Sequence, residues 1–335
     1  MSVSQAGPVS EPSAARDRAA VIDKARATGI LLPFAALFVT LSVTSSSFLT
    51  KVNLLNILDQ QAATLIIAAA GTLVLVAGGI DLSVGAVYSL AGVTAAEVAQ
   101  RTSPVLAIVL GIGVGLAVGL VNGLVVTRGR INALIATLAM SFVVSGIGTL
   151  VTHGNLVVLF EHPEFGDLAR TQIFTVKTSI WIALAAVAII GVLLARTTAG
   201  RYMYAAGGNT EAARLVGVRV DAIRVLTFVV SGGAAGLAGV IDASRVLSAQ
   251  ASSGDTRAFT VLAGIVVGGT SILGGEGAVW RTFLGVLFIA LIGNGYDLLG
   301  LDPLYEQITL GVILLLAVAG RRVGAPAADL RAGVR

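Results

Sequence analysis

The sequence predicts an all-α integral membrane protein, a polytopic bundle of about ten transmembrane helices. Of its 335 residues, 56% are hydrophobic and only 12% are charged, about half the charged fraction of an ordinary soluble domain. Ten apolar segments approach the length of about 20 residues that a helix needs to cross a bilayer. The chain lacks the period-two alternation of a barrel, so helices must satisfy the backbone hydrogen bonds inside lipid.

The ten segments follow one another with short polar connections. The third and eighth are short enough to be tilted or re-entrant, so eight full spans are an open alternative. We expect spans at residues 29–49, 61–79, 82–98, 104–127, 132–152, 178–197, 221–244, 258–274, 278–298 and 303–320.

Positive charges predict the orientation, because cytoplasmic loops carry an excess of Lys and Arg. With the N-terminus inside and ten spans, sixteen of the 22 lysines and arginines fall on the cytoplasmic side. Both termini are then cytoplasmic, as polar tails at 1–28 (disordered) and 321–335, and a loop at about 198–220 faces the same side. The six on the outer side are Lys51, Arg101, Arg170, Lys177, Arg245 and Arg257.

Composition and motifs exclude several functions. The chain has no cysteine, and hence no disulfide or thiolate site. Its two histidines, His153 and His162, lack metal-ligand spacing, and no basic stripe with interleaved aromatics indicates nucleic-acid binding. The Gly-rich stretch 268–277 lacks the lysine of a phosphate loop. We therefore expect no catalytic residue, no metal and no cofactor on this chain.

A polar, Gly-rich segment between two apolar spans is the strongest functional candidate. Asn209 or Thr210 can cap a short helix, Glu211 lies in its first turn, and Gly217 ends it. A short capped helix of small residues can enter a groove on a partner, although an ordinary connecting loop is the alternative. The candidate coupling residues are Gly200, Arg201, Gly207, Asn209, Glu211, Ala212, Ala213, Arg214 and Gly217.

Two other Gly pairs interrupt apolar runs and echo each other weakly. After Gly78 and Gly79, Asp81 or Ser83 can cap the next helix; a proton or ion relay at Asp81 is the alternative. The second pair is followed by Thr270 and Ser271. Amides within spans, such as Asn294, pack by hydrogen bonding across helices or line a polar path. The candidates beside a path are Gly78, Gly79, Asp81, Ser83, Gly268, Gly269, Thr270, Ser271 and Asn294.

Four motifs, in order between about residues 48 and 320, carry a resemblance to a known family. They are Asn53-Leu54-Leu55-Asn56-Ile57-Leu58, Gly79-Ile80-Asp81-Leu82-Ser83-Val84-Gly85, the Gly200–Gly217 segment, and Gly268-Gly269-Thr270-Ser271 with Gly274-Gly275 and later Asn294-Gly295. The chain resembles the permease subunits of bacterial ABC importers for monosaccharides of the ribose, xylose and galactose type, which are related to branched-chain amino acid permeases.

The resemblance implies a permease domain at residues 29–320 in the bacterial inner membrane, forming a homo- or heterodimer. It implies that a cytoplasmic ATPase subunit, which uses ATP and Mg²⁺, docks on the Glu-Ala-Ala element and that an extracytoplasmic solute-binding protein delivers the sugar. Solute would cross by alternating access without covalent change.

The chain departs from the family pattern at two places. Arg257-Ala258-Phe259 replaces a Tyr-Glu-Leu-like stretch, and Arg281 replaces a glycine. Both departures bear on which solute is carried. A branched-chain amino acid, inositol or signalling-sugar importer is therefore an alternative, as are an ion-coupled secondary transporter and a non-transporting scaffold or receptor.

Overall fold

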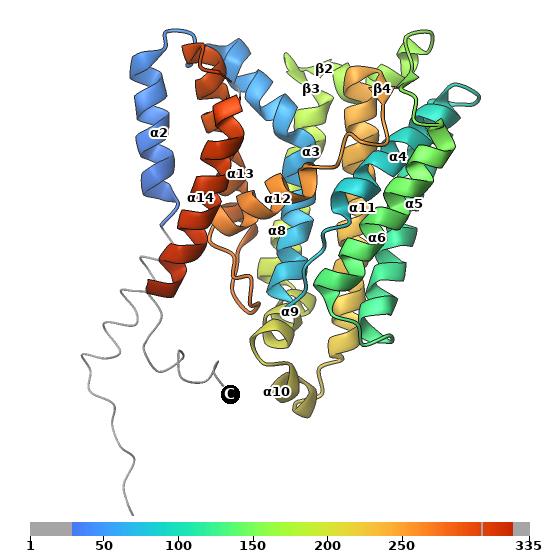
Figure 1. Cartoon of the computed structure of the whole chain (residues 1–335), viewed down its shortest axis with the longest axis vertical. Coiled ribbons are helices and arrows are strands. Elements are labelled where there is room, and N and C mark those ends of the chain that lie inside the picture. The colour runs from blue at the N-terminus through green and yellow to red at the C-terminus, as the bar shows by residue number, and fades with distance from the viewer. Residues whose placement is uncertain (1–28, 303, 324–335) are drawn as a thin grey trace, which may run out of the picture.

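The computed structural model describes residues 29–302 and 304–323, which form a bundle of helices (Figure 1). The helices are α2 (Leu31–Thr44), α3 (Lys51–Val76), α4 (Val84–Ala99), α5 (Pro104–Thr127), α6 (Ala133–Thr152), α7 (Asp167–Arg170), α8 (Thr178–Arg196), α9 (Thr198–Gly208), α10 (Thr210–Leu215), α11 (Val220–Val246), α12 (Arg257–Val267), α13 (Val279–Leu299) and α14 (Leu304–Val323).

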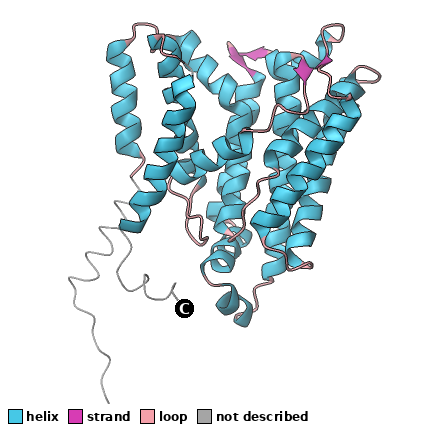
Figure 2. Cartoon of the chain, viewed as in Figure 1, coloured by secondary structure: helices cyan, strands magenta, loops and turns pink. Residues whose placement is uncertain are grey.

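Short strands and one 3-10 turn complete the described chain. Strand β1 (Val157–Val158) pairs antiparallel with β4 (Ser248–Ala249), and β2 (Gln172–Ile173) pairs with β3 (Val176–Lys177). Figure 2 shows that these strands gather at one end of the bundle, opposite α9 and α10. The connection between α6 and α8 is therefore a small structured cap.

The ten predicted segments each contain an apolar helix. Six helices of the described chain, α3, α5, α6, α8, α11 and α13, have at least 18 residues and are apolar enough to cross a membrane. The four shorter apolar helices are Leu31–Thr44, Val84–Ala99, Arg257–Val267 and Leu304–Leu316. The two segments expected to be short, α4 and α12, are among them.

Several predicted boundaries were wrong, chiefly at the start of α3. This helix begins at Lys51, ten residues before the predicted span, because its polar residues have partners inside the bundle. Asp59, for example, accepts hydrogen bonds from Lys177 Nζ at 2.6 Å and from the Ser179 hydroxyl. At the other end of the chain, α14 continues three residues into the predicted tail. The rest of that tail, 324–335, and the tail at 1–28 lie outside the described residues.

Helices α4 and α12 leave extended backbone inside the bundle. Figure 1 shows that residues 77–83 run from the end of α3 toward the middle of the bundle, where α4 begins, and that α12 also lies at mid-height. The chain after α12 descends to the end where α9 and α10 lie before α13 starts. Each interrupted pass thus contains non-helical backbone that protein, and not lipid, must cover.

Small residues let the central helices approach closely. Gly111, Gly115 and Gly119 recur every fourth residue of α5 and face glycines of α11. A methyl group at Gly115 would lie 2.9 Å from the Cα of Gly236, and one at Gly232 would lie 2.8 Å from the Cα of Gly119. Backbone-to-backbone packing of this kind drives association where lipid removes the hydrophobic effect.

Asn294, one of the candidates beside a path, packs between helices. Its amide nitrogen donates to Asn53 Oδ1 at 2.9 Å, and Asn53 donates back to Asn294 Oδ1 at 3.1 Å. This reciprocal pair joins α3 to α13, and we interpret it as a packing contact.

Replacing Asn294 with alanine is expected to lower the free energy of unfolding by about 1 kcal/mol, because two amide hydrogen bonds are lost. A double-mutant cycle with Asn53→Ala, measured by denaturant unfolding in detergent, should give a coupling energy of similar size. Strict additivity of the two substitutions would contradict a direct pair.

Two of the arginines that the charge count assigns to the outer side of the membrane have side chains that are partly buried among the helices. The Arg245 and Arg257 side chains are each 22% exposed, and both approach Asp242 of α11. The carboxylate holds both guanidinium groups among α3, α4, α11 and α12, which a charge count along the sequence has no means to detect.

Candidate functional site

Helices α9 and α10 form an elbow that protrudes from one end of the bundle (Figure 1). The turn from α8 into α9 is tight, because Thr197 caps α9 by accepting from the Gly200 N–H at 3.1 Å. A methyl group at Gly200 would overlap the backbone carbonyl of Leu194. Arg201, the next residue, is exposed and donates to Thr198 Oγ1 at 2.9 Å.

Helix α10 has the cap that the sequence predicts. Asn209 Oδ1 accepts from the Ala212 N–H at 2.9 Å, and Glu211 lies exposed in the first turn. Ala213 is buried against the bundle while Ala212 is exposed. Gly217 has φ +86°, a left-handed conformation that favours glycine and ends the helix.

Arg214 binds outside its own helix. Its guanidinium lies 2.8 Å from Asp221 Oδ1 at the start of α11, rather than against Glu211 one turn away. The Glu211 carboxylate is therefore left facing outward on α10. This ion pair links α10 to α11 and leaves the Glu211 carboxylate exposed.

Two exposed apolar side chains extend the outer face of the elbow. Leu215, the last residue of the capped helix, is 89% exposed, and Val216, which follows it, is 79% exposed. The prediction from sequence omitted both. Two large apolar residues at the end of a short polar helix, just before a Gly stop, are the signal that would have found them.

Gly207 joins the elbow to both interrupted passes. A methyl group at Gly207 would overlap the carbonyl oxygen of Val76 and lie 2.7 Å from the backbone nitrogen of Gly275. That nitrogen itself donates to the Val76 carbonyl at 2.9 Å. Similarly, a methyl group at Gly274 would lie 2.9 Å from the Cα of Gly78 and 3.2 Å from the Cα of Gly207. We call Gly78, Gly207, Gly274 and Gly275 the glycine joint.

Two side chains brace the glycine joint. The Tyr204 hydroxyl of α9 donates to the Gly277 carbonyl at 2.7 Å, and burial raises the pKa of this phenol, so it stays protonated as a donor. Arg224 of α11 donates to the Ala77 carbonyl at 3.4 Å and to Thr210 Oγ1 at 3.0 Å. The elbow is thus connected to α3, to α11 and to the loop before α13.

Beyond the first Gly pair, Asp81 organises the non-helical segment. Its Oδ1 accepts from the Ser83 N–H at 3.0 Å and the Ser83 hydroxyl at 2.6 Å, and its Oδ2 accepts from Ser231 of α11 at 2.8 Å. Ser83 in turn accepts from Asn122 of α5 at 2.8 Å. Ser83 stands at the N-cap of α4 without a capping bond of its own, and Asp81 holds the start of the helix.

Asp81→Ala is expected to lower the free energy of unfolding by about 2 to 4 kcal/mol, because it leaves buried donors on Ser83 and Ser231 unpaired. Denaturant unfolding in detergent measures this, with Asp255→Ala in an exposed turn as the control. A variant with unchanged stability but an altered pH or ion dependence of transport would instead indicate a proton or ion relay.

The second Gly pair ends α12 and turns the chain toward the joint. Gly269 has φ +92°, and Thr270 is fully buried. A methyl group at Gly268 would lie 2.8 Å from the Cα of Thr282. The Ser271 N–H donates to the Glu276 carbonyl at 2.9 Å and closes the loop. The second pair therefore allows close packing on α13 and a compact loop.

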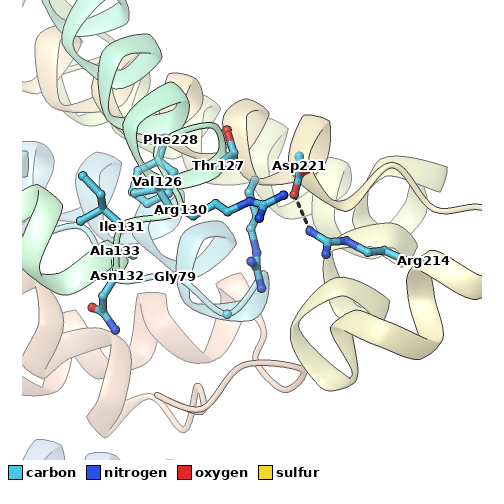
Figure 3. Close-up of a pocket in the computed structure, with 12 residues that line it drawn as sticks. Gly79, Val126, Thr127, Arg130, Ile131, Asn132, Ala133, Arg214, Asp221 and Phe228 are labelled. Carbon is cyan, nitrogen blue, oxygen red and sulfur yellow. Dashed lines mark hydrogen bonds and ion pairs between the residues drawn. The ribbon is translucent and has the colours of Figure 1, made fainter.

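A cavity of about 720 Å³ lies beside the elbow (Figure 3). Arg130, Arg214 and Arg224 line it, with Asp221 paired to Arg214. Gly78 and Gly79 form part of its wall, so the cavity borders the first interruption. Its location between the α5–α6 turn and the elbow places a basic surface at this end of the bundle.

The sequence predicts the elbow but not its contacts with the bundle. Tyr204 and Arg224 were not among the candidates, and Thr210, Gly274 and Gly275 appeared only as a possible cap and as part of a motif. The contacts themselves have no local signal, because the partners lie far away in the sequence. Within residues 29–302 and 304–323, no group of three or more His, Asp or Glu side chains is placed to hold a metal ion.

Comparisons with known proteins identify the family. The family described as branched-chain amino acid transport system / permease component matches residues 53–318. The ribose import permease protein of Escherichia coli K12 is 36% identical over 292 residues, covering 86% of this chain and 91% of that protein. Its counterpart in Bacillus subtilis 168 is 38% identical over 291 residues, covering 85% and 90%.

A third relative, the L-arabinose transport system permease protein of Escherichia coli K12, is 36% identical over 291 residues, covering 87% of this chain and 88% of that protein. No solved structure matches the chain. The polytopic apolar helices agree with these matches. The chain therefore belongs to this family of transport permease components, as the multi-pass inner-membrane subunit of an ABC importer rather than an enzyme.

Proposed function

We propose that this chain translocates a monosaccharide, which a solute-binding protein delivers and a separate cytoplasmic ATPase drives through the elbow of α9 and α10. The relatives named for ribose and arabinose import support the class of solute. ATP and Mg²⁺ act at the ATPase, and a second permease copy completes the membrane unit.

The glycine joint is the observation that carries this proposal. A partner that moves α10 moves Gly207, and Gly207 lies between the end of α3 and the loop that follows α12. These two places are where the passes of the chain are interrupted. Tight backbone contact transmits displacement with little loss, since packed interiors deform as units. When a partner moves α10, the two interrupted passes shift together, and this shift opens the path to the other side of the membrane.

The exposed face of α10 suits an ATPase partner. Glu211, Leu215 and Val216 offer one carboxylate and two apolar side chains on a rigid, capped helix. The chain carries no phosphate loop of its own, so a separate ATPase subunit would have to hydrolyse the ATP that drives transport. A groove on the ATPase with a basic rim and an apolar floor would complement this surface.

We place the elbow and both termini in the cytoplasm. The N-terminal end of α2 and the C-terminal end of α14 are both directed toward the end of the bundle that carries α9 and α10 (Figure 1). That end also carries Arg128, Arg130 and Arg219, in keeping with the excess of positive charge on cytoplasmic loops. The strand-bearing end then faces the solute-binding protein.

Reconstitution tests the proposal. Proteoliposomes containing the permease with its ATPase and binding protein are expected to accumulate radiolabelled ribose or arabinose only when ATP is supplied on the elbow side. A catalytically inactive ATPase is the control. Sustained uphill accumulation by the permease alone, driven by an ion gradient, would contradict the proposal and favour a secondary transporter.

A further inference from the structure

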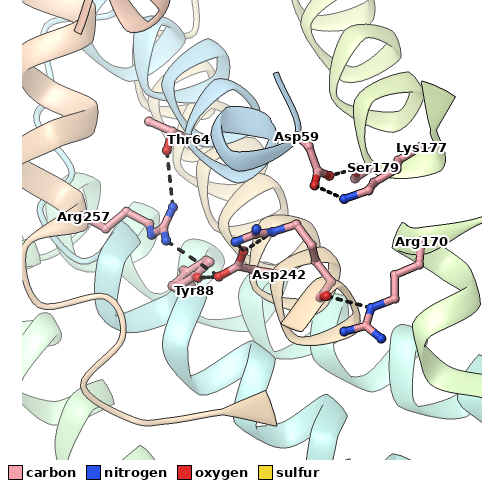
Figure 4. Close-up of polar contacts among 9 residues, drawn as sticks. Asp59, Thr64, Tyr88, Arg170, Lys177, Ser179, Asp242 and Arg257 are labelled. Carbon is pink, nitrogen blue, oxygen red and sulfur yellow. Dashed lines mark hydrogen bonds and ion pairs between the residues drawn. The ribbon is translucent and has the colours of Figure 1, made fainter. Parts of the chain in front are cut away.

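A second pocket, of about 410 Å³, lies among α3, α11 and α12, within the size range of small-molecule sites. Every side chain that lines it is polar or charged, and among them are Gln60, Gln61, Thr64, Arg245 and Arg257. Figure 4 shows Thr64 and Arg257 directed toward each other across this region, with Tyr88 and Asp242 beside them. No part of the coupling machinery described above contributes to this pocket.

The pocket extends into the bundle from its strand-bearing end, because Arg245 lies in the last turn of α11 and Gln60 follows Asp59, which is paired with Lys177 of β3. Gln60 and Thr64 follow Lys51, the first residue of α3, by nine and thirteen positions, which corresponds to about 14 to 20 Å along the helix. Arg257 opens α12 at mid-height (Figure 1). Polar and charged groups at this depth are expensive, and they mark solute paths when they surround a cavity.

The charges around this pocket do not balance. Asp242 is paired with Arg245, whose Nε and Nη2 lie 3.0 and 2.6 Å from its Oδ1, and it also accepts from the Tyr88 hydroxyl. Arg257 is a second cation, 3.7 Å from the other carboxylate oxygen. Asp255, in the turn before α12, is exposed and does not line the pocket. Two guanidinium groups and one carboxylate leave one excess positive charge.

Besides this one long contact with the Asp242 carboxylate, which Arg245 already engages more closely, Arg257 is held in place by two neutral groups. Its guanidinium carbon lies 4.3 Å from the centre of the Tyr88 ring, and its Nη1 donates to Thr64 Oγ1 at 3.3 Å. Asp59, the nearest other carboxylate on α3, is paired with Lys177 and Ser179. The guanidinium is therefore oriented but not neutralised, and its planar N–H groups match a carboxylate.

We infer that this pocket holds the transported solute on its way into the bundle, and that Arg257 selects a monosaccharide bearing one carboxylate, a sugar acid. Gln60, Gln61 and Thr64 supply donors and acceptors for the sugar hydroxyls, and one excess cation matches one carboxylate. This inference rests on the proposed function and narrows its solute class.

The first test uses the unmodified complex. Proteoliposomes with the permease, its ATPase and its binding protein are offered matched pairs, ribose with ribonate and galactose with galacturonate, and also galactose 6-phosphate. Preferential ATP-dependent uptake of the sugar acids is expected. Uptake of neutral sugars in preference to the acids overturns the inference but keeps the proposed function. Preference for the phosphate ester overturns the carboxylate assignment. The absence of ATP-dependent uptake of any of these sugars would contradict both the inference and the proposed function.

The second test asks whether Arg257 is the selecting group. Arg257→Gln is expected to lower the ratio of sugar-acid to neutral-sugar uptake by about tenfold, as the loss of one charge-assisted contact predicts, and Arg257→Lys should restore part of it. Arg101→Gln removes an exposed arginine at the strand-bearing end and should leave the ratio unchanged. An unchanged ratio in a folded Arg257→Gln variant, with unfolding monitored in parallel, overturns the inference.

Discussion

Replacing Glu211 with lysine is expected to abolish ATP-driven transport while the permease stays folded. The Glu211 side chain is exposed in the first turn of α10, so a charge reversal removes only the favourable interaction with the helix dipole, about 0.3 to 1 kcal/mol. It also places a cation where the proposed docking surface carries an anion. Uptake in proteoliposomes, co-purification of the ATPase and thermal unfolding measure the three consequences.

The matched control is Glu161→Lys, the same reversal at an exposed position of the strand-bearing end. This variant is expected to transport normally. Because the structure leaves Leu215 and Val216 exposed beside Glu211, Leu215→Asp should reproduce the defect by removing apolar contact. Normal, coupled uptake by Glu211→Lys would show that α10 is not the docking element.

Gly207→Ala is expected to uncouple ATP hydrolysis from transport and to destabilise the permease. The added methyl group overlaps the Val76 carbonyl and lies 2.7 Å from the Gly275 nitrogen, so it breaks the hydrogen bond between these groups and separates α9 from α3. Overpacking of this kind is destabilising by about 1 to 3 kcal/mol. ATPase binding should survive, since α10 keeps its exposed face, whereas solute-stimulated hydrolysis and uptake should fall together.

The adjacent glycine supplies a control. Gly208→Ala makes the same chemical change one residue further along α9, where the nearest atom to the new methyl group is the Gly275 Cα at 4.0 Å. We expect near-normal uptake and stability from this variant. Equal effects of the two substitutions would contradict the glycine joint as the transmitting contact and indicate a general intolerance of side chains at the end of α9.

Local chemistry in the sequence was enough to predict much of this molecule. Each of the ten apolar segments contains a helix, since a run of apolar residues of the right length has only one structure in lipid. The cap at Asn209 and the stop at Gly217 also follow from residues a few positions apart, and both are confirmed. The motifs quoted above also predicted that the chain belongs with the permease subunits of ABC importers.

The start of α3, the partner of Arg214 and the location of Arg257 were decided by tertiary structure. Lys51–Gln61 is helical because Asn53 and Asp59 find partners on distant helices. Arg257 lies in a polar pocket because Thr64 and Tyr88 are packed against it.

The sequence by itself determined which segments are helices, where they begin to be interrupted and that a capped helix protrudes between two of them. Only the tertiary structure decided that Gly207 meets Val76 and Gly275, and that two arginines share one aspartate inside the bundle. The physical reason is how far apart in the sequence the interacting residues lie. Backbone hydrogen bonds and caps link residues within about four positions, whereas these contacts join residues that only the packing of whole helices brings together.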